Sequence, residues 1–152
     1  MGDKCQICIA GGGPAGLMLG VLLARAGVTV TVLEKHADFL RDFRGDTIHP
    51  STMQVLHELG WLDEFLQLPH NPVRKLGGRF GDQAVMVADF SHLPVAAPFI
   101  ALMPQWDFLN FLARKGSAYP TFTLRMRTQA RDLFVENGRI AGIKADGPDG
   151  HV

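Results

Sequence analysis

Residues 4–35 read KCQICIAGGGPAGLMLGVLLARAGVTVTVLEK, and this stretch decides the fold. A short apolar run, residues 5–10, leads into a glycine-rich turn, and a helical pattern follows it until Gly27. Residues 28–33 then form a second apolar run of strand character, which ends at Glu34. Strand, glycine-rich turn, helix, strand and acid, in that order, predict the βαβ unit that binds dinucleotides.

The glycine-rich turn is the predicted phosphate site. Gly13 has no side chain, so a pyrophosphate can approach the backbone, and Gly16 lets the helix pack closely on the strands. Pro14 suits a first helical turn, where no N–H is needed. The helix N-terminus presents unpaired N–H groups and a partial positive charge to the phosphates. The predicted cofactor-binding residues of the turn are Gly11, Gly12, Gly13, Pro14, Ala15 and Gly16.

Glu34 is the predicted ribose ligand. It lies 23 positions after Gly11, where a carboxylate can accept a hydrogen bond from a ribose 2′-hydroxyl. A 2′-phosphate would meet a like charge there, so FAD or NAD is favoured over NADP. The alternative is a βαβ unit that binds nothing, which the flanking strands, helix and acid make the weaker interpretation.

Composition excludes several classes of protein. The 152 residues, 47% of them hydrophobic, suffice for about one domain. Fifteen basic and fifteen acidic residues cancel, so nothing indicates a nucleic-acid partner or an anionic membrane surface. The longest apolar run, residues 17–24, is too short to span a bilayer, which takes about 20 residues. We therefore expect a cytoplasmic protein without an integral membrane segment.

The two cysteines, Cys5 and Cys8, have the C-x-x-C spacing of redox and metal pairs. In a regular strand, residues three apart lie about 10 Å apart and point to opposite faces, too far for a disulfide. We therefore expect buried, inert thiols. The histidines have no metal-ligand spacing, so no metal site is predicted.

The remainder of the chain mixes helical, strand and turn patterns. We expect helices at 51–59, 61–68 and 105–115, strands at 73–80, 84–90 and 121–126, and a hairpin of 130–136 with 139–144 around Asn137-Gly138. Three prolines predict an extended crossing over 91–104, and residues 146–150 form a turn-rich stretch with no partner. The sheet this leaves is incomplete, which predicts the N-terminal part of a longer protein whose C-terminal remainder is absent.

Three segments carry a resemblance to a known family. They are IAGGGPAGL at 9–17 with VLEK at 32–35, FRGDTIHP at 43–50, and LMPQ at 102–105. In this order and spacing they resemble the FAD-dependent aromatic hydroxylases typified by para-hydroxybenzoate hydroxylase. The resemblance implies an α/β, Rossmann-like FAD/NAD(P)-binding three-layer fold.

The resemblance also implies roles for single residues at the adenylate half of FAD. Glu34 should bind the adenosine ribose, and Lys35 should lie beside the adenine. The backbone around Ala130 should line the adenine pocket. Ala15 stands where some relatives carry a hydroxyl residue, which removes one phosphate contact.

A second group is implied on the flavin side. Arg44 should reach the pyrophosphate and ribityl chain, with Gly45, Asp46 and Thr47 supplying backbone contacts. Gln105 should bond the ribityl or phosphate region. No residue is predicted to act as a catalytic acid or base, since a flavin carries the hard chemistry.

The implied domain layout has three parts. Residues 1–72 hold the FAD-binding βαβ unit and the following helices, 73–104 form a β excursion toward a substrate domain, and 105–152 return to the FAD-binding domain. The implied whole is a flavin-dependent monooxygenase that hydroxylates an aromatic or related electron-rich small molecule with O2 and NADPH or NADH. The alternatives are another FAD-dependent oxidoreductase, such as an isoprenoid reductase or halogenase, and a non-catalytic FAD- or NAD-binding module.

Overall fold

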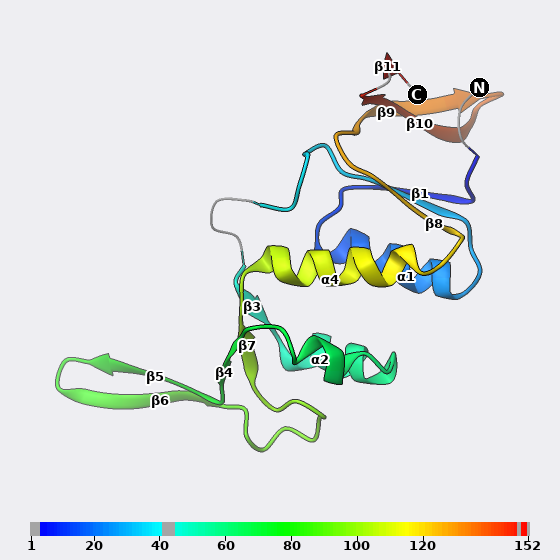
Figure 1. The fold of residues 1–152 in the computed structure, drawn as a ribbon. Helices are drawn as coiled ribbons and strands as arrows, with labels where there is room; N and C mark the ends of the chain where they lie inside the picture. The colour runs from blue at the N-terminus through cyan, green and yellow to red at the C-terminus, as the bar shows by residue number, and fades with distance from the viewer. Residues whose placement is uncertain (1–3, 41–44, 149, 152) are drawn as a thin grey trace. The chain divides into compact units, whose positions relative to one another are not determined.

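The computed structural model describes residues 4–40, 45–148 and 150–151 and is drawn in Figure 1. The chain divides into two compact units. The first combines residues 1–40 with 108–152, and the second holds residues 41–107.

A parallel sheet forms the centre of the first unit. Its strands are β1 (Ile7–Ala10), β2 (Val30–Leu33) and β8 (Phe122–Arg125), in the order β1-β2-β8. All four residues of the middle strand β2 are buried, as expected for a parallel strand covered on both faces. The predicted strand–helix–strand order is therefore confirmed, and the predicted strand at 121–126 joins the same sheet.

Two helices cover one face of this sheet, α1 (Pro14–Arg25) and α4 (Gln105–Ser117). Glycines permit the close approach. A Cβ at Gly20 would lie 2.7 Å from Val32 Cγ2, and one at Gly116 would lie 2.6 Å from Phe122 Cε1. Any larger residue at these positions would push the helices away from the strands.

An antiparallel sheet faces the other side of the central strands (Figure 1). It consists of β9 (Gln129–Glu136), β10 (Arg139–Gly147) and β11 (Gly150–His151), in the order β11-β10-β9. Asn137 and Gly138 both have positive φ, +52° and +75°, which a two-residue type I′ hairpin requires. Helices, parallel sheet and hairpin make the predicted three layers.

Two sequence expectations for this layer are wrong. Residues 146–150 do turn, but they are not without a partner: β10 continues to Gly147, and β11 returns to pair with it, Asp146 opposite His151 and Gly147 opposite Gly150. Cys5 and Cys8 do not face opposite ways, since both line one pocket of about 860 Å³ between the central strands and the β9–β10 hairpin.

The second unit joins two helices to a small sheet. The helices α2 (Pro50–Glu58) and α3 (Leu62–Phe65) agree with the expected ones. The strands β3 (Thr47–Ile48), β7 (Ile100–Leu102) and β4 (Asn71–Val73) pair antiparallel in the order β3-β7-β4. The expectation that 91–104 lacks a regular element is wrong, because β7 gains hydrogen-bond partners on both sides between its flanking prolines.

A two-stranded ribbon extends from this unit (Figure 1). It consists of β5 (Lys75–Phe80) and β6 (Gln83–Asp89), the predicted hairpin. Its apolar side chains are exposed: Phe80 is 71% exposed and Val87 67%. In the described part of the chain, no helix is long and apolar enough to cross a membrane.

Candidate functional site

The turn between β1 and α1 exposes backbone groups at a helix N-terminus. Gly11 has a φ of +113°, and its N–H donates to the Leu33 carbonyl across 2.8 Å, which fixes the turn against β2. Gly13 is the N-cap of α1 and makes no side-chain capping bond. A Cβ on Gly13 would meet no described atom within 4 Å. The amides of the first α1 turn are thus available to an anion.

Gly16 fixes the direction of the helix. A Cβ there would overlap the carbonyl oxygen of Gly11 and would also approach Ile9 Cγ2 to 3.3 Å. Only glycine lets α1 leave the turn at this angle, as the sequence predicted for close packing.

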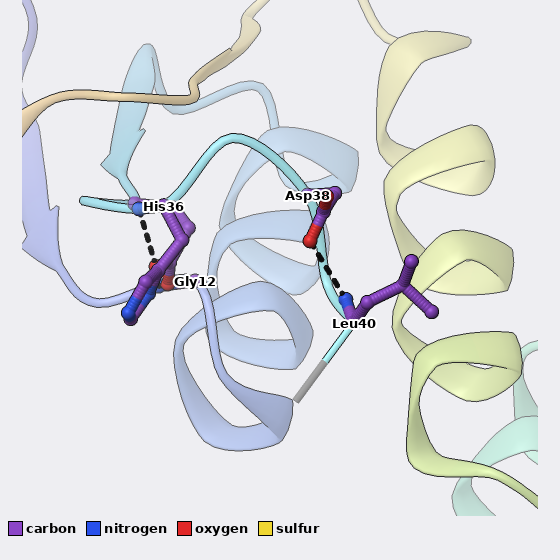
Figure 2. A network of polar contacts seen from close by, with 5 residues as sticks. Gly12, His36, Asp38 and Leu40 are labelled. Carbon is purple, nitrogen blue, oxygen red and sulfur yellow. Dashed lines mark hydrogen bonds and ion pairs between the residues drawn. The ribbon is translucent and has the colours of Figure 1, made fainter. Parts of the chain in front are cut away.

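Glu34 lies against the glycine turn. Glu34 is only 8% exposed, and its Oε2 accepts a hydrogen bond from the Gly12 N–H across 3.0 Å. Its Oε1 accepts the His36 N–H across 3.0 Å and lies 2.6 Å from His36 Nδ1 (Figure 2). A Cβ at Gly12 would come within 2.8 Å of Glu34 Cβ. The acid at the end of β2 therefore holds the turn directly.

Backbone groups of residues 125–128, at and after the end of β8, form hydrogen bonds with Glu34 and His36. Glu34 N–H donates to the Arg125 carbonyl, and Thr128 N–H donates to the Glu34 carbonyl, both across 2.8 Å. Arg127 N–H donates to the His36 carbonyl, also across 2.8 Å. Arg127 has a φ of +53°, a conformation that is uncommon and costly for a residue other than glycine. His36 and Arg127 are not among the site residues predicted from the sequence.

His36 and Arg127 differ in whether a sequence pattern could have indicated them. His36 lies two positions after a predicted ligand, close enough for its ring to reach that carboxylate. Nothing local marks Arg127, whose conformation depends on contacts across about 90 residues of chain. Lys35 is exposed, and Ala130 is half-buried in β9, opposite Ala145.

The predicted flavin-side residues gather in the second unit. Gly45 has a φ of +61°, and the Nε2 atom of Gln105 lies 2.9 Å from the place its Cβ would take. Asp46 and Thr47 lead into β3, which pairs with β7 shortly before Gln105. Two segments about 60 residues apart thus lie side by side. Arg44 is outside the described residues.

The described residues contain no cluster of metal-ligating side chains. Among residues 4–40, 45–148 and 150–151, no three His, Cys, Asp or Glu side chains are grouped to hold an ion. In the first unit the candidate site is instead a set of backbone amides and one buried carboxylate. Such donors and acceptors suit phosphates and hydroxyl groups.

A family model described as an FAD binding domain matches residues 4–150. The chain belongs to this FAD binding domain family. The 6-methylpretetramide 4-monooxygenase of Streptomyces rimosus is 29% identical to this FAD-binding domain over 154 residues, which cover 96% of the chain and 35% of that protein. The pentachlorophenol 4-monooxygenase of Sphingobium chlorophenolicum is 29% identical over 143 residues, 92% of the chain and 26% of that protein.

A solved structure shares the fold. The p-nitrophenol 4-monooxygenase of Pseudomonas putida superposes with a TM-score of 0.83 at 23% identity, over 100% of this chain and 39% of that one. The FAD-binding domain therefore spans between a quarter and two fifths of these proteins. The resemblance seen in the three sequence segments is confirmed at the level of the domain and its fold.

Proposed function

We propose that this FAD-binding domain is part of a flavin-dependent monooxygenase. Its substrate would be an aromatic or related electron-rich small molecule, and its other reactants O2 and NADH or NADPH. The observation that carries the proposal is the bond from Gly12 to Glu34, which puts a buried carboxylate beside the open N-terminus of α1. Two of the relatives above, both monooxygenases, support the reaction type.

The turn suits the adenylate half of FAD. No described atom lies within 4 Å of the place that a Gly13 Cβ would take, and this space would admit a pyrophosphate to the first α1 amides. A carboxylate can accept about four hydrogen bonds, so Glu34 is able to hold Gly12 and also accept from a ribose hydroxyl. We assign Lys35 and the backbone near Ala130 to the adenine side. The fit of this site to FAD rests on the turn and the acid together.

The second unit supplies the flavin side in this proposal. Gly45, Asp46, Thr47 and Gln105 lie together, and the resemblance adds Arg44. A guanidinium suits phosphate because it donates two parallel hydrogen bonds. FAD, when bound, supplies the electron transfer and the activation of oxygen. The residues of this chain bind and orient it, and none of them acts as an acid or base.

The β excursion has a separate role in the proposal. We assign residues 73–104 to a substrate domain, between FAD-binding parts at 1–72 and 105–152. The exposed apolar side chains of the β5–β6 ribbon support this assignment, since such surface is normally covered by other parts of a protein.

The test uses the full natural chain that contains residues 1–152. Denaturation of the purified protein should release FAD, identified by its absorption and by chromatography. Oxygen consumption with NADH or NADPH should rise when phenolic compounds are added. A protein that takes up no FAD contradicts the cofactor assignment. One that binds FAD but never consumes oxygen with any reductant contradicts the monooxygenase and favours the non-catalytic module.

A variant separates binding from folding. Gly13 has a φ of −75° and open space in front of it, so Gly13→Asp and Gly13→Ser should both fold. Gly13→Asp puts a negative charge where the pyrophosphate is expected and should lose FAD, while Gly13→Ser should lose much less. Equal retention of FAD by both variants would remove the turn from the cofactor site.

A further inference from the structure

The chain is irregular where β1 begins. The N–H groups of Gln6 and Ile7 both donate to the Thr29 carbonyl, across 2.9 and 3.2 Å. The Thr29 N–H donates in turn to Gln6 Oε1 across 2.9 Å. The shared carbonyl shows that Gln6 lies outside the regular ladder, which starts at Ile7. Cys5 precedes this irregular residue and Cys8 follows it.

Because the chain is irregular before Ile7, both thiols can face one pocket. Cys5 and Cys8 line the same pocket of about 860 Å³, and each is half-buried and unoxidised. The geometry of a regular strand, which separates such residues by about 10 Å, applies only from Ile7 onward. The C-x-x-C spacing therefore brings two accessible thiols together.

Three cationic side chains, Lys4, Arg125 and Lys144, also line this pocket. Burial raises the pKa of the Cys8 thiol, and the neighbouring Cys5 raises it further. The raised pKa leaves less Cys8 thiolate at neutral pH, so Cys8 is a poor candidate for the first attack.

We propose that Cys5 and Cys8 are a site of reversible oxidation, a dithiol that closes into a disulfide by exchange with a small disulfide such as glutathione disulfide. The Cys5 thiolate attacks one sulfur of that disulfide and releases one glutathione thiolate. Cys8, as thiolate, then attacks the Cys5 sulfur of the mixed disulfide and releases the second glutathione. The dithiol loses two electrons, the glutathione disulfide gains them, and the two thiol protons end on the two glutathiones. The proposal is independent of FAD.

Peptide mapping tests the closure directly. Trypsin cleaves after Lys4 and after Arg25, so residues 5–25 form one peptide that holds both cysteines. The full natural chain, folded, is equilibrated with glutathione and its disulfide, then alkylated and digested. The expected 5–25 peptide is unalkylated and lighter by two hydrogens than the dithiol form. A peptide with two alkyl groups, or with two glutathiones, in every redox buffer overturns the proposal.

Denatured chain provides the matched control. If the fold brings the thiols together, the disulfide should form in the folded protein at an oxidant ratio about tenfold lower than in the same chain in urea. Equal ratios would show that the fold contributes nothing and would overturn the site.

Single variants test the order of attack. Cys8→Ser should trap one glutathione on Cys5, because no second thiol resolves the adduct, and Cys5→Ser should react more slowly at Cys8. Both adducts are read from the mass of the same peptide. Faster reaction at Cys8 in Cys5→Ser than at Cys5 in Cys8→Ser would overturn the assignment of Cys5 as the attacking thiol.

Discussion

Replacing Glu34 by alanine tests both roles of this carboxylate at once. The side chain accepts the buried Gly12 amide and the His36 amide, each across 3.0 Å. In the proposed complex it also accepts a ribose hydroxyl. The substitution removes all of these contacts, so the stability of the protein and its affinity for FAD should both fall.

The size of each effect follows from the burial of the partners. The hydrogen bond to Gly12 is buried, and a buried donor left without an acceptor costs about 1–3 kcal/mol. The His36 amide is partly buried and can be hydrated, so it adds less. A hydrogen bond to a charged group contributes about 1.5–3 kcal/mol. Loss of that bond to ribose should raise the Kd for FAD by roughly 10- to 100-fold.

Two measurements separate these effects. Urea unfolding of the apoprotein gives the change in the free energy of unfolding, and fluorescence titration with FAD gives the Kd. Glu34→Gln should fall between wild type and alanine, since one amide oxygen can still accept from Gly12. Glu58→Ala, which removes an exposed carboxylate on α2, is the control and should change neither quantity. An unchanged Kd in folded Glu34→Ala would refute the ribose assignment, and an unchanged free energy of unfolding would refute the structural one.

Three further outcomes are expected. Gly20→Ala puts a Cβ 2.7 Å from Val32 Cγ2 and should cost about 1–3 kcal/mol of stability by overpacking, read from urea unfolding; wild-type stability would contradict the close approach of α1. Gln105→Ala should weaken FAD binding while the exposed-residue control Gln67→Ala does not, as measured by flavin fluorescence; equal affinities would exclude Gln105. The Ser91 backbone N–H and Lys75 lower the pKa of Asp89 to about 2. The stabilisation that depends on its charge should therefore be present at neutral pH and lost only as the pH falls from about 4 through 2, and an NMR titration of Asp89 with a midpoint near 4 would contradict this.

The first unit could be predicted from sequence because its signals are local. The positive φ of Gly11 and the close packing at Gly16 both require glycine, and Glu34 stands where a strand pattern ends. Each of these features can be recognised in the sequence. The Asn137-Gly138 turn is equally local, since few residues other than asparagine and glycine accept positive φ. Proximity in the chain made these predictions possible.

The errors concern partners that are distant or irregular. β7 is only three residues long, and its existence depends on two strands whose paired residues lie between 27 (Val73 to Ile100) and 55 (Thr47 to Leu102) positions earlier. The flanking prolines argue against a strand, so the sequence alone does not predict this pairing. β10 extends to Gly147 because β11 returns to it, and no turn preference reveals such a return. The relation of Cys5 to Cys8 depends on the irregular chain at Gln6, whose amide shares the Thr29 carbonyl with the amide of Ile7, and the strand pattern alone does not indicate it.

The exposed ribbon of β5 and β6 has a practical consequence for anyone who purifies these residues by themselves. Phe80, Met86 and Val87 are 71%, 58% and 67% exposed, and the ribbon has two unpaired edges in the described part of the chain. Apolar edge strands of this kind template aggregation between copies. Concentrated samples of the isolated segment should therefore precipitate through this ribbon, and lysine substitutions at its tip should keep them in solution.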